Sequence, residues 1–224
     1  PNADKIGMIR SLIEEGINPK GMGLFLASYS RLYKITKDKI WLDKAEKILK
    51  WLEENSSKNY SNYCWGYNFD WQNRAFYLPK FTPTIVNTSF IGHSILDLYE
   101  ITKDKKLLEI VKSSCDFIMN DLNRFETDSH LCFSYTPLDN TRVHNASILG
   151  AGLIARYSRI KLIDNYDELI NKCSNYLIYH QRDNGSWAYA QTNYQGWVDS
   201  FHTGFNLFSL KFINEKLNNS AIRK

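Results

Sequence analysis

Several histidines, carboxylates and tyrosines stand at spacings that could serve proton transfer. Asp199 and His202 are three residues apart at the start of a predicted helix, and Tyr135 lies in an earlier polar stretch. A histidine base with a phenol as acid would suit elimination from a uronate or its C5 epimerisation. Two carboxyls flanking one bond would instead suit glycoside hydrolysis. The predicted catalytic residues are Asp199, His202, His144, Asp70 and Tyr135.

Aromatic residues in the predicted loops are the strongest compositional signal. Amphipathic rings beside amides, carboxylates and arginines suit sugars, because rings stack on C–H faces and polar groups bind hydroxyls. Converging helix N-termini with Arg74 and Arg142 would favour an acidic saccharide. Alternatively, the aromatic rings only fill the mouth of the fold. The predicted substrate-binding residues are Trp65, Tyr67, Trp71, Arg74, Asn87, Asp139, Arg142, Asn145, Trp187, Tyr189 and Trp197.

Asp199, His202 and His144 could also be considered as metal ligands. Two ligands at positions i and i+3 of a helix start often occur by chance, so we predict no metal and no cofactor.

The elements that must position these residues repeat along the chain. The stretch 33–39 is matched by seven residues beginning at Tyr99, 66 positions later. An offset of 58 then aligns Asn87 with Asn145 and Tyr99 with Tyr157. Self-similarity at such a period indicates a repeat architecture, in which each repeat is one supersecondary unit.

Each repeat has the pattern of a helical hairpin preceded by a short extended segment with alternating aromatics. The stretch 84–102 is apolar around its circumference, which predicts an inner, covered helix, whereas 105–122 carries one apolar stripe and should lie outside. Inner helices are predicted at 21–36, 84–102, 145–160 and 201–217, and outer helices at 4–15, 39–54, 105–122 and 165–180. These form an all-α fold, an α/α toroid in a single domain. The ring should be incomplete or smaller than usual, because six hairpins need roughly 330 residues.

The bulk composition excludes several functional classes. The net charge of +4 is spread along the chain and does not indicate nucleic acid, and no stretch is apolar enough for a membrane span. Four cysteines without C-x-x-C spacing predict buried thiols and a cytoplasmic location. The chain begins at Pro1 without an apolar signal segment, which predicts a C-terminal fragment of a longer protein. The sequence does not indicate an oligomeric state.

Two resemblances support this fold. Gln181, Gly185 and Trp187 match the Q-x3-G-x-W core of the QW repeat, a structural brace in terpenoid cyclases, and the pattern is similar to the six-hairpin and prenyltransferase-like toroids. The cyclases' D-x-D-D motif and the prenyltransferases' zinc set are absent from this sequence. The closer resemblance is to uncharacterised bacterial and archaeal α/α-toroid proteins associated with surface-polysaccharide biosynthesis. It covers nearly the whole chain and is carried by stretches 64–74, 82–90, 133–139, 145–147 and 197–204. This resemblance implies a carbohydrate context and no particular catalytic residue.

Three hypotheses about function follow. The first is an enzyme that binds an acidic saccharide in the toroid mouth, as a lyase, epimerase or hydrolase. The second is a non-catalytic glycan-binding or scaffolding module. The third is a toroid that handles isoprenoids.

Overall fold

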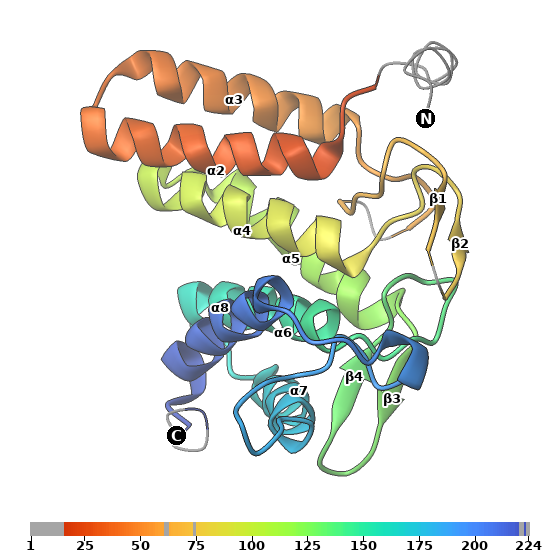
Figure 1. Cartoon of the computed structure of the whole chain (residues 1–224). Coiled ribbons are helices and arrows are strands. Elements are labelled where there is room, and N and C mark those ends of the chain that lie inside the picture. Colours follow the sequence, from red (N-terminus) through yellow and green to blue (C-terminus); the bar gives the residue numbers. More distant parts are fainter. Residues whose placement is uncertain (1–15, 61–62, 74, 220–221, 223–224) are drawn as a thin grey trace.

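The computed structural model describes residues 16–60, 63–73, 75–219 and 222. The described chain is an arc of helical hairpins, seen in Figure 1 as successive layers. The hairpins are α2 (Pro19–Thr36) with α3 (Lys39–Glu54), α4 (Ile85–Thr102) with α5 (Lys105–Asn120) and α6 (His144–Lys161) with α7 (Asp167–Tyr179), followed by α8 (Ser200–Leu217). The fold is the predicted α/α toroid with four inner helices, α2, α4, α6 and α8. The helix predicted at 4–15 lies outside the described residues.

The first two hairpins close through the same tight turn. Lys37 and Lys103 end the inner helices in the left-handed conformation, at φ 59° and 58°. The aspartate that follows each lysine caps the outer helix, and its side chain accepts the backbone N–H of Ile40 or Lys106. The repeated Lys-Asp-Lys sequence therefore encodes the turn that was predicted from it.

The caps also correct the predicted register between α4 and α6. The N-caps Thr84 and Val143, like the C-caps Lys103 and Leu162, are 59 residues apart rather than 58. The same offset relates Thr88 Oγ1, which accepts the backbone N–H of Trp65, to Ser147 Oγ, which accepts that of Phe133. Asn145 therefore stands one position earlier in its helix than Asn87 does. The predicted equivalence of these asparagines was off by one residue.

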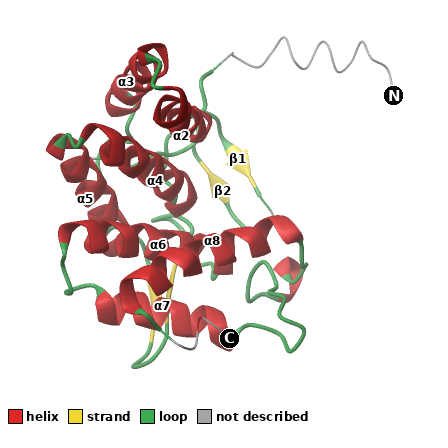
Figure 2. Cartoon of the chain, turned by 90° about the vertical axis from the view of Figure 1, so that its left-hand side faces the viewer, coloured by secondary structure: helices red, strands yellow, loops and turns green. Residues whose placement is uncertain are grey.

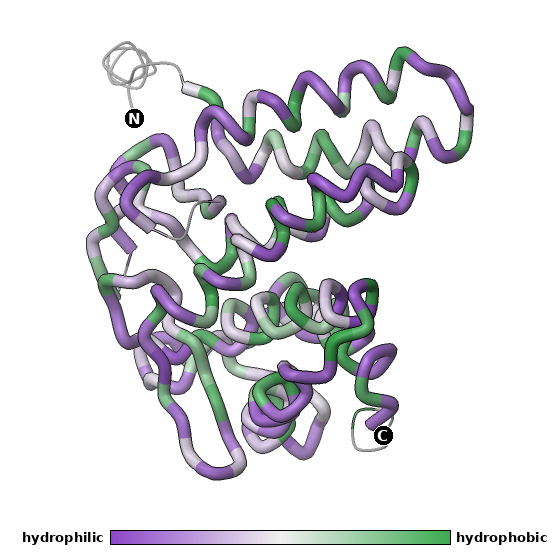
Figure 3. The backbone as a smooth tube through the Cα atoms, turned by 180° about the vertical axis from the view of Figure 1, so that it is seen from behind, coloured by the Kyte–Doolittle hydropathy of each residue, from purple (hydrophilic) through white to green (hydrophobic). Residues whose placement is uncertain are grey.

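Burial separates the middle of the arc from its ends. Helices α4 and α6 are covered around most of their circumference, as predicted for inner helices. They approach closely because Gly92 lies against Leu153, where an added Cβ would sit 2.6 Å from a methyl carbon. Helices α2 and α8 bury only one side each and expose apolar residues on the other. Figures 2 and 3 show the arrangement of the helices and their hydropathy.

Short strands and loops gather where the inner helices begin (Figure 1). Strand β1 (Trp71–Gln72) pairs with β2 (Tyr77–Leu78), and β3 (Arg124–Glu126) pairs with β4 (Leu131–Phe133), both antiparallel. The 3₁₀ helix η1 (Asn193–Gln195) precedes α8. None of the described helices has the length and apolar character needed to cross a membrane. All four cysteines are buried and unpaired, as their pattern predicted.

Candidate active site

A cavity of about 510 Å³ opens among the loops at the N-terminal ends of the inner helices. Its volume lies in the usual range for small-ligand sites. The β1–β2 hairpin supplies one wall, and the segment leading through η1 into α8 supplies the other. The lining residues are Trp71, Asn73, Tyr189, Gln195, Trp197 and His202. Four of these, the three aromatics and His202, were predicted from the sequence.

The aromatic wall is held by the backbone. Tyr189 and Trp197 stack with ring centroids 4.4 Å apart and planes 13° from parallel. The backbone N–H of Tyr189 donates to the carbonyl of Trp197 at 2.8 Å. That of Ala190 donates to the carbonyl of Gln195, so the strand-like segment folds back on η1 and holds the two rings face to face. A fixed stack of two aromatic rings beside two amides results.

His202 is oriented by the carboxylate that caps its own helix. Asp199 Oδ1 accepts the backbone N–H of His202 at 2.7 Å, and Oδ2 lies 2.6 Å from His202 Nδ1. Because an ionised carboxylate can only accept, Nδ1 carries a proton, and in the neutral imidazole the lone pair is on Nε2. Partial burial acts to raise the pKa of Asp199, but the hydrogen bonds and charge of His202 outweigh it and leave that pKa below its ordinary value. The pair therefore offers a base within the cavity lining.

Tyr189 stands beside this base with its phenol protonated. Its ring meets that of His202 edge-on, with centroids 4.6 Å apart. Burial first, and then the nearby Tyr67, Asp139 and Asp199, raise the pKa of Tyr189 to about 12. At neutral pH the phenol keeps its proton, so the cavity combines a proton acceptor with a proton donor.

Tyr67 and Tyr135 pack against Trp71, one of the residues that line the cavity. Their phenols are hydrogen-bonded to each other, and the ring of Trp71 lies 5.4 Å from Tyr67 and 5.7 Å from Tyr135. Burial raises the pKa of Tyr135 well above its ordinary value. Tyr135, predicted to be catalytic, therefore lies next to the cavity without lining it and fixes Trp71 by packing.

Trp65 and Trp187, predicted to bind substrate, are buried in the core. The indole Nε1 of Trp65 donates to the carbonyl of Leu52 at 2.9 Å, and that of Trp187 donates to the carbonyl of Leu177 at 2.9 Å. Each tryptophan thus fastens the loop after an outer helix to that helix's last turn. Gln181 Nε2 donates to the carbonyl of Gly185, so the QW-like motif acts as a brace, as its resemblance implied.

The other predicted carboxylates hold loops together. Asp139 is buried and accepts the backbone N–H groups of Thr136 and Thr141, both at 2.7 Å. Asp70 accepts the backbone N–H of Lys80 at 2.8 Å and the phenol of Tyr77, which closes the β1–β2 hairpin. Both aspartates stabilise turns of the backbone through these hydrogen bonds, and neither lines the cavity.

The remaining predicted residues that the structure describes do not line the cavity. Arg142 places its guanidinium 3.9 Å from the ring centre of Phe125 and donates to Gln191.

His144 is buried, its Nδ1 lies 2.8 Å from the carbonyl of Ala188, and it stacks on His180. Burial and the charge of His180 lower the pKa of His144 to about 4, although the hydrogen bond to Ala188 opposes them. Asn87 and Asn145 are enclosed near the starts of α4 and α6. Arg74 lies outside the described residues.

Two cavity residues, Asn73 and Gln195, were missed by sequence reasoning. Each stands two positions from an aromatic residue of the lining, Trp71 or Trp197. That spacing was the only signal available, because amides are common in loops. Within the described part of the chain, no group of three or more His, Cys, Asp or Glu side chains could hold a metal ion.

One family model matches part of the chain. Residues 21–131 match the family model described as Glycosyl Hydrolase Family 88. No curated protein sequence matches the chain.

Three solved structures show the same fold. A cellobiose 2-epimerase from Spirochaeta thermophila DSM 6192 is 12% identical with a TM-score of 0.69, over 92% of this chain and 55% of its own. The GH76A α-1,6-mannanase from Salegentibacter sp. HEL1_6 is 14% identical with a TM-score of 0.66, over 93% and 58%. A polysaccharide lyase is 11% identical with a TM-score of 0.64, over 95% and 66%. The chain thus spans little more than half the length of the epimerase and the mannanase.

Proposed function

We propose that the cavity binds a saccharide and that His202 exchanges a proton with it. The observation that carries the proposal is the position of His202 in an aromatic-lined cavity with Asp199 hydrogen-bonded to its Nδ1. The family match and the names of the similar structures support a carbohydrate-active enzyme.

The lining suits a sugar ring. Tyr189 and Trp197 offer a stacked aromatic surface for its C–H face, while the amides of Asn73 and Gln195 can bind hydroxyls. The mixture of rings and amides favours a saccharide over an isoprenoid, which needs no hydrogen-bonding partners.

The carboxylates favour proton transfer over hydrolysis by two carboxyls. Asp199 is engaged with His202, while Asp70 and Asp139 are engaged in loops. A hydrolase of the usual kind needs two carboxyls that flank one bond. The described cavity lining instead supplies a histidine and a phenol.

The reaction class that fits this pair is elimination from, or C5 epimerisation of, a uronate. His202 Nε2 removes the proton next to the carboxylate. In elimination, the electron pair of that C–H bond forms a C–C double bond, the bond to the leaving oxygen breaks, and Tyr189 gives its proton to that oxygen. In epimerisation, Tyr189 gives its proton to the same carbon on the face opposite His202, and no other bond breaks. An acidic saccharide, with Arg74 as the cation that offsets its charge, stays a prediction from the sequence.

The test is to incubate the protein with uronate oligosaccharides and, in parallel, with neutral ones. Elimination is followed by the absorbance of the unsaturated product, and epimerisation by deuterium incorporation from heavy water. We expect His202→Ala to lower the rate by about 10²- to 10⁴-fold. Turnover that survives this substitution, or the absence of any binding, would overturn the proposal.

A glycan-binding module is the second candidate, and the Tyr189–Trp197 stack favours it because stacking alone can hold a sugar. It predicts saccharide binding that is retained in His202→Ala with no product from any substrate. Titration calorimetry with the same oligosaccharides distinguishes the two.

A further inference from the structure

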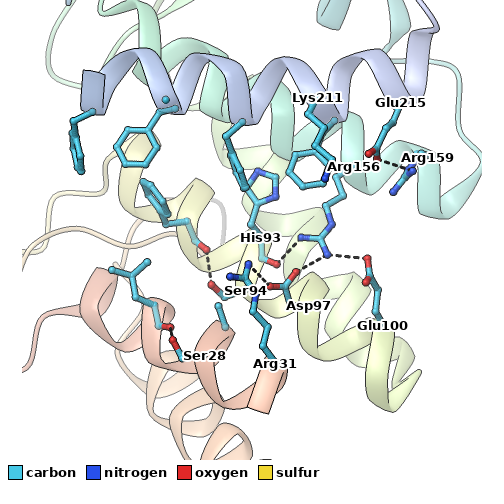
Figure 4. A pocket seen from close by; sticks show the side chains of 18 residues that line it. Ser28, Arg31, His93, Ser94, Asp97, Glu100, Arg156, Arg159, Lys211 and Glu215 are labelled. Atoms are coloured by element: carbon cyan, nitrogen blue, oxygen red, sulfur yellow. Dashed lines mark hydrogen bonds and ion pairs between the residues drawn. The ribbon is translucent and has the colours of Figure 1, made fainter. Parts of the chain in front are cut away.

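A second cavity of about 630 Å³ lies on the concave side of the arc, between α8 and the helices α2, α4 and α6. Figure 4 shows its side chains, which come from all four inner helices. We call it the concave cleft.

Three arginines at the charged end of the cleft are paired with carboxylates of the protein. Arg156 lies within 2.8 Å of both Asp97 and Glu100, Arg31 reaches Asp97 at 3.3 Å, and Arg159 pairs with Glu215 at 2.8 Å. Figure 4 shows these pairs gathered toward one end of the cleft. These three arginines already have carboxylate partners.

The other end is apolar and open. Phe201 contacts Phe205 with ring centroids 4.5 Å apart, and Phe205 contacts Phe90 at 5.0 Å. Phe201 is 62% exposed and Leu24, on the facing wall, is 48% exposed. A run of phenyl rings has no polar atom with which to bind hydroxyls, so this surface suits an apolar group.

The apolar end adjoins the candidate active site. Phe201 of the cleft and His202 of the first cavity are consecutive residues in the first turn of α8, and their ring centroids are 5.3 Å apart. A molecule whose sugar contacts His202 would therefore carry its next substituent close to Phe201.

We infer that the saccharide acted on is a glycoside with an apolar aglycone, an alkyl or aryl group that lies along Phe201, Phe205 and Leu24. The inference rests on the proposed function, since the sugar is placed by the first cavity. It adds the class of substituent to which the sugar is attached.

The test compares methyl glucuronide with octyl glucuronide, using octanol as the probe without sugar. Each additional buried methylene raises affinity by roughly fourfold, so we expect octyl glucuronide to bind at least tenfold more tightly, measured by calorimetry below its micelle concentration. Octanol alone should bind more weakly than octyl glucuronide.

Two exposed cleft residues provide the variants, Phe201→Ala and Leu24→Ala. Each should lower the octyl-to-methyl affinity ratio by about three- to tenfold. The matched control is Leu207→Ala, also on α8 and 56% exposed but outside the cleft lining, which should leave the ratio unchanged. Sedimentation velocity on each variant determines whether self-association covers the cleft.

The outcomes separate this inference from the proposed function. Equal affinity for the two glucuronides, an octyl advantage that survives both cleft variants, or an advantage that vanishes when self-association is prevented would each overturn the aglycone site while sugar binding stands. Binding of octanol as tight as that of octyl glucuronide would also overturn it. If neither glucuronide binds but uronate oligosaccharides do, the aglycone inference fails alone; if no saccharide binds, the proposed function itself fails.

Discussion

Asp199 holds His202 at two points, the backbone N–H through Oδ1 at 2.7 Å and the imidazole Nδ1 through Oδ2 at 2.6 Å. One carboxylate thus begins helix α8 and orients the proposed base. The helix cannot start elsewhere without also changing the direction of the ring.

Asp199→Asn should separate these two roles. The Asn oxygen can still accept the backbone N–H, but its amide donates toward Nδ1 and moves the imidazole proton to Nε2. We expect turnover to fall by about 10²- to 10⁴-fold while the melting temperature changes little. The matched control is Asp38→Asn, at the N-cap of α3, which should affect neither. An unchanged rate in Asp199→Asn would contradict the orienting role.

Tyr189→Phe should affect kcat more than KM. The substitution keeps the ring that stacks on Trp197 but removes a phenol whose pKa is raised to about 12. Loss of a general acid typically costs about 10²- to 10⁴-fold in rate, and binding should stay within a fewfold. Steady-state kinetics on uronate oligosaccharides checks this, with Tyr179→Phe on the exposed side of α7 as control. A change confined to KM would assign Tyr189 to binding alone.

Arg156→Met should destabilise the arc. Its guanidinium is almost fully buried and bridges Asp97 and Glu100, while it also donates to the carbonyl of His93. Breaking a buried pair from one side costs about 3–5 kcal/mol, and because both carboxylates retain some exposure we expect about 2–4 kcal/mol. Urea denaturation measures the loss.

An exposed ion pair provides the comparison. Lys50 and Glu54 are 4.0 Å apart with side chains 78% and 60% exposed, and such pairs contribute little in water. Lys50→Met should change the free energy of unfolding by less than about 0.5 kcal/mol. Equal effects of Arg156→Met and Lys50→Met would mean that the buried pair contributes no more than a surface one.

The fold should lose stability as the pH falls from about 6.5 to about 4. Burial lowers the pKa of His144 to about 4, so between these values the unfolded chain binds a proton that the folded chain does not. The shift corresponds to a loss of about 3 kcal/mol once the pH lies below both values. Burial also lowers the pKa of His93, which acts in the same direction.

His144→Gln removes this titration while it can still donate to Ala188. The free energy of unfolding, measured by urea at several pH values, should depend less steeply on pH in the variant than in the original protein. His130→Gln, at a half-buried position on the β3–β4 hairpin, serves as control. Parallel curves for His144→Gln and the original protein would refute the assignment.

The helices could be predicted because the evidence for them is local. The Lys-Asp-Lys turns and the apolar circumference of 84–102 are properties of short stretches, and they led to the correct hairpins. The register of α6 was missed by one residue because the letters that coincide at an offset of 58 lie inside the helices and do not stand at the same distance from the helix caps.

The candidate site was predicted only in part, since aromatic residues serve two purposes here. Trp65 and Trp197 both stand in loops and look alike in sequence, yet the first is enclosed against Leu52 and the second lines the cavity. The indole of Trp65 is buried because its N–H donates to the carbonyl of Leu52 in another element, and that contact cannot be read from the sequence. Asp139 and Asp199 also look alike in sequence, yet the first accepts from Thr136 and Thr141 in a loop and the second from His202 at the start of α8.

The indole hydrogen bonds of Trp65 and Trp187 have a consequence for how such a chain can change over evolutionary time. Each hydrogen bond joins a loop to the outer helix that directly precedes it in the sequence. The bond therefore needs no residue from a distant part of the chain. A segment duplicated with its tryptophan brings its own attachment. Hairpins can then be gained or lost while the segment that carries Asp199 and His202 diverges separately.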